Sequence, residues 1–513
     1  MNVERRVPVH RSREASGTCS LPLTGTRAII LPMALPHPLV HCADAALIDE
    51  AAVALGQDLG QLMENAGAAL AREAQHLAPS GTILVACGAA NNGGDGYVCA
   101  RLLAAAGRRV WVWPVVEPKS VLCCRNAALL PSSVQRLHSL PAEEPALVVD
   151  AILGTGARGR PKDPVAGALE RLRAIRAPIL AADVPSGLGS DLCLPATLTL
   201  CFQVAKIELL RHPLLGEFKT VDIGVLPAAW QDVQPQIFRR FPALKRTAHK
   251  GTHGELLVIG GGIFPGALEL ACRAALMTGC DLVRAWTAQG PKLPATVVFH
   301  RQSGKYLVPA DTAALTPLLV RAGAVLIGPG LGREGASMEA ARQAFSLAIE
   351  MGIPVIVDAD GIAALAEVIR TLPEGAGRVL LTPHRAEARS LLGGPADEEA
   401  LHAFARPDRV ILGKAVVDLI TDGWQWQHNP RGNPRMAVGG TGDLLAGLAA
   451  GFVARGAGGF DAARMAVLWL TTTADLLWQE QGPCYDAESV LERLPSTLRS
   501  FLEPLGMWPP VVG

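Results

Sequence analysis

The chain of 513 residues lacks net charge, is poor in aromatic residues and contains no long hydrophobic run. Lys and Arg together number 47, as do Asp and Glu, so no excess of positive charge attracts nucleic acid or an anionic membrane. Aromatic residues make up 4% of the chain, and no stretch interleaves them with basic residues. No apolar run reaches the roughly 18 residues that a transmembrane helix needs. We therefore predict neither nucleic acid nor a membrane as a partner.

The 11 cysteines also lack a pattern, because no Cys-x-x-Cys pair occurs among them. Most lie in apolar segments, as Cys87, Cys201 and Cys280 do. A scattered, odd-numbered set is typical of buried free thiols in a reducing compartment. We predict a cytoplasmic location and a structural role for the adjacent pair Cys123-Cys124.

The first 32 residues carry several Arg and Pro and show no regular hydrophobic period. A targeting peptide is one interpretation, but Glu4 and Glu14 are unusual in such leaders. The favoured alternatives are a disordered tail over residues 1–38 or a translation start at Met33 instead of Met1, because the pattern becomes regular after Met33.

What the chain does have is a long alternation of strand and helix patterns, in two series. The first series predicts helices at 43–77 and 97–106 and strands at 82–87, 110–116, 146–150, 178–183 and 197–202. The second predicts strands at 255–259, 324–327, 354–358, 379–382 and 410–412, with helices at 266–278, 442–455 and 462–477. This length and alternation predict two tandem α/β domains at 39–232 and 249–505, joined by a linker at 233–248.

Polar residues follow three predicted strands of the first series. Residues 91–96 read Asn-Asn-Gly-Gly-Asp-Gly, and Asp150 and Asp183 each end an apolar strand. Ligands in open α/β sheets bind beyond the carboxyl ends of strands, although an Asx-rich turn is the alternative for residues 91–96. Asn92, Asp150 and Ser186 offer only oxygen atoms, which suit a hard cation, and leave Asp183 as a candidate general base.

The order of these motifs, at 91–96, 149–156 and 183–187, resembles the NAD(P)H-hydrate epimerase domain, a Rossmann-like three-layer fold, over about residues 40–230. That family interconverts the R and S forms of C6-hydrated NADH and NADPH, called NADHX and NADPHX. The resemblance implies a potassium ion held by Asn92, Asp150 and Ser186. It implies substrate contacts from Asn91, Asn92, Gly93, Gly94, Asp95, Gly154, Thr155, Gly156, Ala157, Arg158, Gly159, Arg160 and Asp183. Lys206 matches a family lysine whose role stays open.

Two features depart from the epimerase pattern. Gly88-Ala89-Ala90 stands where the family has Gly-Pro-Gly, and a methyl group at Ala90 forbids the most strained glycine conformations. Residues 189–192 lead almost directly into the next strand, where the family has a longer loop. The alternative of an inactive epimerase-like half therefore stays open.

In the second series, residues 439–443 read Gly-Gly-Thr-Gly-Asp and open an apolar helix. Glycines before a helix leave backbone N–H groups free to bind an anion, and the helix dipole adds to that attraction. Asp443 would then handle a proton or hydroxyl beside a phosphate, although Asp is also a common helix cap.

Further glycine, Asp and His residues follow other strands of this series, at 260–262, 328–332, 358–360 and 382–384. Each segment alone is an ordinary turn, but ordinary turns do not readily explain such residues at four successive strand ends. No His or Cys lies at ligand spacing from His384, so we expect no His-based metal site. Lys250, before the first strand, is a candidate for phosphate contact.

This set resembles the ADP/ATP-dependent NAD(P)H-hydrate dehydratase of the ribokinase-like superfamily, over about residues 249–490. The resemblance implies that Asp443 is the acid/base acting on the C6 hydroxyl, and that ADP or ATP binds with Mg²⁺. The implied substrate contacts are Ala267, Gly330, His384 and Asp443, and the implied nucleotide contacts are Lys414, Ala415, Val416, Val417, Asp418 and Gly442.

This half also departs from its family at three places. Lys414-Ala415 replaces Lys-Gly, Arg385-Ala386 replaces Pro-Gly, and residues 361–364 supply no Asn after Asp360. Together the halves resemble bifunctional NAD(P)H-hydrate repair enzymes, and we expect a homo-oligomer. A ribokinase-like small-molecule kinase is the main alternative. The preferences for ADP or ATP and for NADHX or NADPHX stay open.

Overall fold

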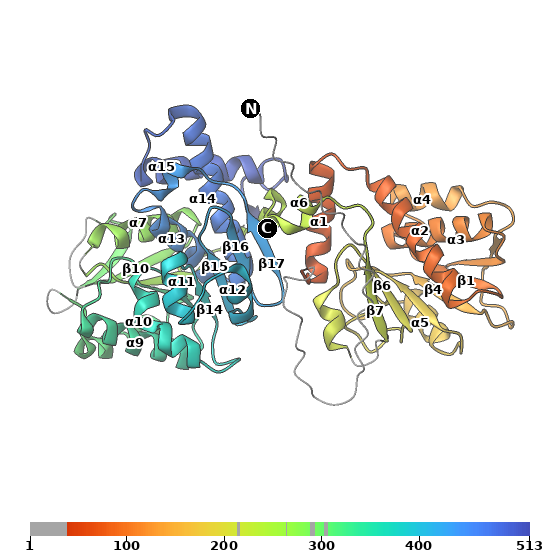
Figure 1. The fold of residues 1–513 in the computed structure, drawn as a ribbon, viewed down its shortest axis with the longest axis horizontal. Helices are drawn as coiled ribbons and strands as arrows, with labels where there is room; N and C mark the ends of the chain where they lie inside the picture. The colour runs from red at the N-terminus through yellow and green to blue at the C-terminus, as the bar shows by residue number, and fades with distance from the viewer. Residues whose placement is uncertain (1–37, 213–215, 263, 288–292, 302–305, 513) are drawn as a thin grey trace, which may run out of the picture. The chain divides into compact units, whose positions relative to one another are not determined.

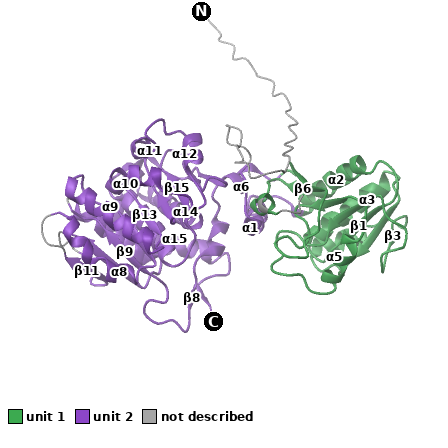
Figure 2. Cartoon of the chain, turned by 90° about the horizontal axis from the view of Figure 1, so that it is seen from below, with its two compact units in different colours: residues 1–31, 60–224 green, residues 32–59, 225–513 purple. Residues whose placement is uncertain are grey.

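The computed structural model describes residues 38–212, 216–262, 264–287, 293–301 and 306–512. The predicted tail and the alternative start at Met33 lie outside the described residues. The described chain forms two compact units, coloured separately in Figure 2. We call Gly60–Gly224 the N-terminal unit, and residues 38–59 together with Val225 onward the C-terminal unit.

The N-terminal unit contains a seven-stranded parallel sheet in the order β3-β2-β1-β4-β5-β6-β7. Its strands are β1 (Ile83–Cys87), β2 (Val110–Pro114), β3 (Gln135–Arg136), β4 (Leu147–Ala151), β5 (Ile179–Ala182), β6 (Leu198–Phe202) and β7 (Glu217–Val221). Its helices are α2 (Leu59–Leu77), α3 (Asn91–Ala105), α4 (Val121–Ala128) and α5 (Val165–Arg173). The strand order reverses between β1 and β4, which is where ligands bind in such folds.

The C-terminal unit contains a nine-stranded sheet in the order β11-β10-β9-β12-β13-β14-β15-β16-β17, with antiparallel pairing only at β15-β16 and β16-β17. Figure 1 labels β10 and β14 to β17 of this sheet. Its strands are β9 (Glu255–Ile259), β10 (Leu282–Thr287), β11 (Val297–Arg301), β12 (Ala324–Ile327), β13 (Val355–Val357), β14 (Val379–Leu381), β15 (Arg409–Gly413), β16 (Asp418–Thr421) and β17 (Trp426–Asn429). β8 (Leu244–Lys245) pairs separately with β18 (Val511–Val512).

The helices of this unit cover both faces of its sheet. They are α1 (Cys42–Ala54), α6 (Pro227–Gln231), α7 (Pro265–Met277), α8 (Thr316–Leu319), α9 (Gly335–Glu350), α10 (Asp360–Thr371), α11 (Arg385–Leu392), α12 (Glu398–Phe404), α13 (Thr441–Ala454), α14 (Gly459–Gln481) and α15 (Ala487–Leu502). Successive residues of β9 join different cores, Leu256 and Val258 in one, Leu257 and Ile259 in the other. Alternating side chains therefore bury both sheet faces, as a doubly wound α/β fold requires.

Helix α13 is apolar on nearly every side because it packs against both the sheet and other helices. It contacts α7, α14 and β12. Gly447 permits the close approach to α7, since a Cβ there would lie 2.2 Å from the carbonyl oxygen of Ala271. The helix that begins with the Gly-Thr-Gly-Asp motif is thus held firmly in the core.

The structure confirms the predicted α/β class and strand positions but corrects two connections. The helix expected over 43–77 is two helices, α1 and α2, and α1 packs within the C-terminal unit. Residues 233–248, expected as a linker, include the 3-10 helix η2 (Pro235–Arg240), where Phe238 is fully buried. The ring of Phe238 stacks on Phe501 with centroids 4.5 Å apart, so apolar packing overrides the charged, proline-containing sequence.

Within the part of the chain that the structure describes, no helix has both the length and the apolar character to cross a membrane.

Candidate active sites

The first candidate site lies at the carboxyl ends of β1, β4 and β5 in the N-terminal unit. The Asn-Asn-Gly-Gly-Asp-Gly motif forms the first turns of α3, which begins at Asn91 and not at the predicted residue 97. Asn91 is exposed, whereas the residues from Asn92 to Asp95 are buried. The motif therefore places side chains and a helix N-terminus at the point where the strand order reverses.

Asp150, at the end of β4, is fully buried and hydrogen-bonded to Ser186. Ser186 donates its backbone N–H to Asp150 Oδ2 at 2.7 Å and its hydroxyl to Oδ1 at 2.6 Å. The backbone N–H of Ile152 also donates to Oδ1 at 3.2 Å. Burial raises the pKa of Asp150 to about 6, although these hydrogen bonds act in the opposite direction.

The three predicted cation ligands, Asn92, Asp150 and Ser186, all lie against the same short segment, residues 152–154. Ser186 Oγ accepts the N–H of Leu153 at 2.8 Å, and a Cβ on Gly154 would lie 3.3 Å from Asn92 Cβ. Asn92 is 8% exposed, and its Nδ2 is a buried polar atom without a hydrogen-bond partner among the described residues.

This donor set fits a cation such as potassium. Amide nitrogen and oxygen are assigned from their partners, so the unsatisfied amide of Asn92 can present its oxygen to a cation instead. With the carboxylate of Asp150 and the hydroxyl of Ser186, all three groups are then oxygen ligands. Among the described residues, no group of three His, Cys, Asp or Glu side chains forms a metal site.

Asp183 follows β5 in a left-handed backbone conformation, with φ of 63°. Its Oδ1 accepts the N–H of Phe202 at 3.0 Å and forms an ion pair with the buried ammonium of Lys206. Lys206 Nζ also donates to the carbonyl oxygens of Phe202 at 3.2 Å and Val204 at 3.0 Å. These three acceptors match the three N–H donors of an ammonium, so Lys206 has no donor left for a ligand.

The predicted substrate loop from Gly154 to Arg160 is the most exposed part of this site. Arg158 donates to the carbonyl oxygens of Thr155 and Ala157 at 2.6 and 2.9 Å. Arg160 forms an exposed ion pair with Asp191 at 3.0 Å. In this structure both guanidinium groups therefore bond to the loop itself or to the turn after Ser186.

The departures from the epimerase pattern leave this geometry intact. Ala90 is extended, with φ of −103° and ψ of −166°, so its position does not require glycine. After Ser186 the chain turns back compactly, because Leu194 donates its N–H to the carbonyl of Ser186 at 3.0 Å. Leu192 and Leu194 are buried at 4% and 0% exposure and close the shortened loop.

The second candidate site lies at the carboxyl ends of the parallel strands of the C-terminal unit. Gly440 caps α13 with φ of 100°, and a Cβ there would lie 2.6 Å from Leu270 Cδ1 and 2.8 Å from Ala487 Cβ. Glycine therefore allows the turn that places Asp443 in the first turn of α13.

Lys414, just after β15, is surrounded by acidic side chains. Its ammonium lies 2.8 Å from Asp358 Oδ1 and 3.9 Å from Glu387 Oε2. Asp358, 2% exposed, also accepts the hydroxyl of Thr382 at 2.7 Å. Burial disfavours the charge of Lys414, but Asp358, Glu387 and then Asp443 outweigh it and raise the pKa of the ammonium.

Asp443 is the group of this cluster that can exchange a proton near neutral pH. Its pKa is raised to about 7, first by burial and then by the negative charge of Asp358, against the opposing charge of Lys414. The negative charge of Glu387 contributes in the same direction as that of Asp358. A proton carrier works best when its pKa lies close to the operating pH.

His384 caps α11 and is oriented by Glu387. His384 Nδ1 accepts the N–H groups of Ala386 and Glu387 at 3.1 and 3.2 Å, and Glu387 Oε2 accepts the N–H of His384 at 2.8 Å. The imidazole Nε2 lies 3.3 Å from Glu387 Oε1. Because Nδ1 accepts, the neutral ring carries its proton on Nε2, and the side chain is 55% exposed to a ligand.

The remaining predicted substrate contacts, Ala267 and Gly330, lie together after β9 and β12. Gly330 has φ of 63°, and a Cβ on it would lie 2.0 Å from the carbonyl of Phe264 and 3.3 Å from Ala267 Cβ. A Cβ on Gly328 in the same loop would lie 1.9 Å from the carbonyl of Asp358. The loop after β12 therefore packs against Ala267 through Gly330 and against Asp358 through Gly328.

The predicted nucleotide contacts from Lys414 to Asp418 form the turn between β15 and β16. Asp418 Oδ1 accepts the N–H of Ala415 at 3.0 Å, while Val416 is 96% exposed. A cavity of about 450 Å³ borders this turn. Residues lining it include Pro383, Arg385, Arg389, Gly413, Lys414, Ala415 and Val417. Gly442 lies beside the same ammonium, since a Cβ on it would be 3.7 Å from Lys414 Nζ.

Most of the departures from the dehydratase pattern fall where glycine is not required. The backbone of Ala415 does not have a positive φ, the conformation that favours glycine. Ala386 lies within helix α11, where glycine is not required either. Lys250, in contrast, is misplaced for phosphate contact at this site. It precedes the amino end of β9, whereas the cluster lies at the carboxyl ends of the strands, on the opposite edge of the sheet.

Three side chains that contact predicted site residues were not predicted as site residues themselves. Lys206 and Asp358 form ion pairs with Asp183 and Lys414, and Glu387 contacts His384. Asp358 could have been found because it ends an apolar strand, and Glu387 because it stands three residues after His384, the spacing of a capping box. No sequence signal indicates that Lys206 reaches Asp183.

Comparison with known proteins assigns both halves. The family model described as YjeF-related protein N-terminus matches residues 59–207, and that described as NAD(P)H-hydrate dehydratase matches residues 256–496. Among solved structures, an ADP/ATP-dependent NAD(P)H-hydrate dehydratase from Bacillus subtilis, co-crystallised with ATP and Mg²⁺, is 26% identical. It has a TM-score of 0.44 and covers 53% of this chain and 99% of its own.

Two curated relatives extend over nearly the whole chain. The bifunctional NAD(P)H-hydrate repair enzyme of Hyperthermus butylicus is 35% identical over 500 residues, covering 90% of this chain and 93% of that protein. The enzyme of the same name from Pyrobaculum aerophilum is 35% identical over 482 residues, covering 86% and 94%. The chain therefore belongs to the family of bifunctional NAD(P)H-hydrate repair enzymes.

Proposed function

We propose that this chain restores hydrated NADH and NADPH in two steps. The N-terminal unit interconverts the R and S epimers of NADHX and NADPHX, and the C-terminal unit dehydrates the S epimer at the expense of ADP or ATP. The observation that carries the proposal is the cluster at the start of α13, where Asp443 lies in the electrostatic field of Lys414, Asp358 and Glu387. The ammonium of Lys414 itself lies 2.8 Å from Asp358 and 3.9 Å from Glu387. A fused pair of activities is chemically sensible, because hydration produces both epimers and the dehydratase accepts one.

In the dehydratase site, Asp443 exchanges the proton of the C6 hydroxyl. Its pKa of about 7 allows it to accept that proton and release it again near neutral pH. His384, Ala267 and Gly330 contact the hydrated nicotinamide, and the imidazole of His384 is 55% exposed beside Glu387. The glycine-rich start of α13 holds phosphate through its backbone N–H groups.

The nucleotide binds at the turn from Lys414 to Asp418 and at Gly442. The cavity beside the turn can accommodate a nucleoside, and Lys414 supplies positive charge for the phosphates. Transfer of the terminal phosphoryl group to the C6 oxygen would release the shortened nucleotide. Loss of inorganic phosphate from C6 and of a proton from C5 would then form the C5–C6 double bond. Mg²⁺, when bound, would supply positive charge for the phosphate groups. Asp358 and Glu387 hold Lys414 in position for that transfer.

In the epimerase site, Asp183 is the general base. Lys206 and the N–H of Phe202 hold Asp183 Oδ1, which fixes the orientation of the carboxylate. The strained backbone at Asp183 supports a functional role, since such conformations concentrate at active sites. Substrate contacts come from residues 91–95 and 154–160 beside it.

Asn92, Asp150 and Ser186 would hold a potassium ion in the epimerase unit. The unsatisfied amide of Asn92 and the buried carboxylate of Asp150 support this assignment. The cation would supply positive charge for the anionic groups of the substrate. A homo-oligomer and a cytoplasmic location belong to the same proposal, and the free cysteines among the described residues suit a reducing compartment.

The test mixes the purified protein with both epimers of NADHX or NADPHX and then adds ADP or ATP. Reduced nicotinamide is followed by its absorbance. Recovery of the whole substrate supports both activities, and recovery of the S fraction alone refutes the epimerase half. A phosphorylated alcohol that accumulates without reduced nicotinamide would establish the kinase alternative instead.

A further inference from the structure

Helix α1 precedes the N-terminal unit in the sequence but packs within the C-terminal unit. Its buried face contains Ile48, Ala51 and Ala52, which are 8%, 1% and 0% exposed. This face contacts α6 and η2, and Leu47 packs against the core that includes α13 and α14. Neither matching family segment, at 59–207 and 256–496, includes α1.

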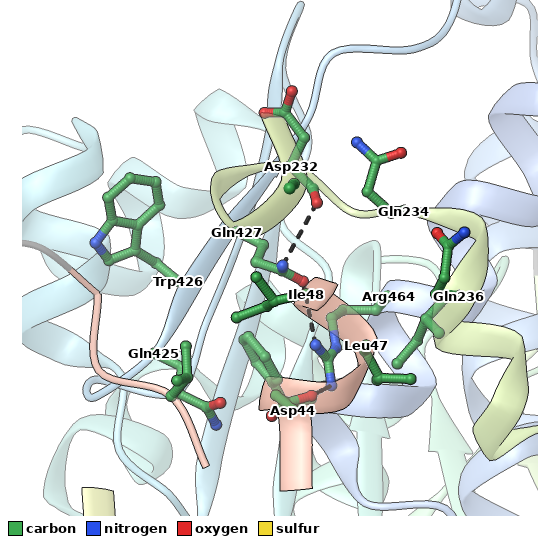
Figure 3. Close-up of a pocket in the computed structure, with 14 residues that line it drawn as sticks. Asp44, Leu47, Ile48, Asp232, Gln234, Gln236, Gln425, Trp426, Gln427 and Arg464 are labelled. Atoms are coloured by element: carbon green, nitrogen blue, oxygen red, sulfur yellow. Dashed lines mark hydrogen bonds and ion pairs between the residues drawn. The ribbon is translucent and has the colours of Figure 1, made fainter. Parts of the chain in front are cut away.

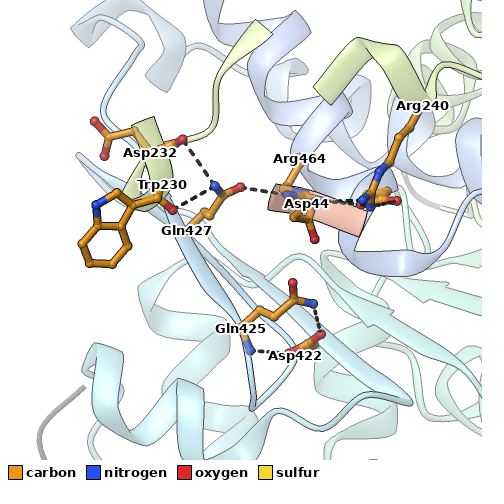
Figure 4. Close-up of polar contacts among 9 residues, drawn as sticks. Asp44, Trp230, Asp232, Arg240, Asp422, Gln425, Gln427 and Arg464 are labelled. Carbon is orange, nitrogen blue, oxygen red and sulfur yellow. Dashed lines mark hydrogen bonds and ion pairs between the residues drawn. The ribbon is translucent and has the colours of Figure 1, made fainter. Parts of the chain in front are cut away.

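A cluster of four charges, of which Asp44 and Arg464 are buried and Arg240 and Asp461 partly buried, fastens α1 to α14 and η2 (Figure 4). Asp44 and Arg464 are each 4% exposed and form an ion pair at 3.1 Å. Arg240 lies 3.0 Å from Asp44 and 2.7 Å from Asp461, and Asp461 also pairs with Arg464. Two carboxylates therefore neutralise two guanidinium groups, and removing one carboxylate leaves a buried positive charge.

Gln427 of β17 ties the same cluster to the segment after α6. It accepts from Arg464 Nη1 at 3.2 Å and donates to the backbone carbonyls of Trp230 at 3.1 Å and Asp232 at 3.4 Å. Figure 3 shows Gln427 between Arg464 and Asp232. The docking surface for α1 thus combines α6, η2, β17 and α14.

Helix α1 packs against this surface with little empty space between them. A cavity of about 30 Å³ remains, lined by Asp44, Ile48, Gln427 and neighbouring residues (Figure 3). Asp44 Oδ2 has no hydrogen-bond partner among the described residues and borders this cavity. The space suits one ordered water, which would complete the hydrogen bonding of Asp44.

Weaker contacts continue along both sides of the helix. Glu50 pairs with Arg239 at 2.9 Å on the surface. Gln57 Oε1 accepts the N–H of Leu226 at 2.9 Å, just before the chain enters α2. The backbone N–H of Leu39 donates to the carbonyl of Trp424 at 3.3 Å. Attachment to the C-terminal unit therefore extends over residues 39–57.

We propose that residues 38–57 are an integral docking segment of the C-terminal unit, and that the N-terminal unit is an insertion between α1 and α6. The C-terminal catalytic unit is then built from both ends of the sequence. Arg464 and Asp461 lie on α14, which packs on α13, the helix that carries Asp443. A cut at the boundary between the two family segments removes a buried counter-ion from the unit that contains Asp443.

The test uses the full chain with two protease recognition sequences, one inserted at the exposed residue Asp58 and one at the exposed residue Asp222. The protein is folded first, cleaved at both sites and separated by size under native conditions. The fragment of residues 1–57 should elute with the fragment beginning at residue 223. If it elutes with the fragment of residues 59–222, or alone, the proposal is wrong. Enzyme activity plays no part in this result.

Two variants of the same cleavable chain test the charge cluster. Asp44→Asn keeps the size of the side chain but removes the buried charge, so fragment 1–57 should dissociate during separation. Glu50→Gln removes an exposed ion pair from the same helix and should leave the fragment bound. Equal retention of the Asp44→Asn and Glu50→Gln fragments would overturn the role assigned to the cluster.

Discussion

The two candidate catalytic carboxylates, Asp183 and Asp443, have opposite electrostatic surroundings. Asp183 is paired with a lysine whose other donors are taken by backbone carbonyls. Asp443 is buried near the negative charge of Asp358, and burial followed by that charge raises its pKa to about 7. The comparison teaches that similar α/β frameworks can hold one carboxylate fixed in orientation by an ammonium group, and another ready to exchange a proton.

The largest expected effect comes from Asp443→Asn. This change removes the proton carrier but keeps the size of the side chain, so we expect kcat for dehydration to fall about 1,000-fold. Epimerisation should be unchanged, because Asp183 lies in the other unit. The measurement is the initial rate of NAD(P)H formation from the S epimer with saturating nucleotide. A loss smaller than tenfold would contradict the role of Asp443.

Asp183→Asn should produce the converse result. We expect epimerisation of the R form to slow about 100-fold, because a general base contributes roughly that factor, while dehydration of the S epimer keeps its rate. Chiral analysis of NADHX without nucleotide isolates the epimerisation step. If wild type and variant convert the R form equally slowly, the N-terminal unit is not an epimerase.

Lys206→Met sharpens the contrast, because it removes the buried ammonium that pairs with Asp183. Without this ammonium, Asp183 Oδ1 loses the partner that fixes the orientation of the carboxylate, so kcat for epimerisation should fall about tenfold. Lys206→Arg, which keeps the charge, should retain more activity. Equal loss of activity in the Lys206→Met and Lys206→Arg variants would contradict this role of the ammonium charge.

Glu387→Gln should move the pH dependence of dehydration. The pH profile of kcat/KM should inflect near pH 7 in the wild type, where Asp443 titrates. The charge of Glu387 contributes to the raised pKa of Asp443, so removing it should move the inflection to lower pH. An unmoved inflection with reduced activity would mean that Glu387 acts only by orienting His384.

The smallest effect concerns potassium. Burial raises the pKa of Asp150 to about 6 in the folded state, so folding favours the protonated carboxyl. The contribution of Asp150 to the free energy of unfolding is therefore largest below about pH 4 and is lost as the pH rises through about 6. A cation bound at pH 8 offsets this loss, and KCl should raise the unfolding temperature by about 3 °C relative to tetramethylammonium chloride. The same increase in Asp150→Asn would exclude a cation at this carboxylate.

The alternating strands and helices, and the polar residues at their ends, could be predicted from the sequence. Apolar strands that end in Asp located Asp150 and Asp183, and the glycine-rich start of an apolar helix located Asp443. The parallel fold brings strand ends and helix starts to one edge of each sheet. Periodicity does not specify which distant side chains meet. The contacts of Lys206 and Glu387 were therefore not predicted. Lys250 precedes β9 as predicted, but this end of the strand is opposite to the end at which Asp358 and Lys414 lie.

Hydrophobic periodicity also does not indicate that α1 packs with the C-terminal unit. Helical spacing runs through 43–77, but the turn at residues 55–58 separates two helices that bury their apolar faces in different units. The linker prediction failed for a related reason. Arg239 and Arg240 made residues 233–248 look exposed, whereas each pairs with an acidic partner while Phe238 is buried beside them.

The most direct test of two separate catalytic carboxylates is one progress curve, recorded for three proteins on an equal mixture of R and S epimers with ATP. Wild type should recover all of the reduced nicotinamide absorbance. Asp183→Asn should stop at the S fraction, before slow uncatalysed interconversion, and Asp443→Asn should recover almost none. Full recovery by Asp443→Asn, or an identical curve for Asp183→Asn and wild type, would contradict the account.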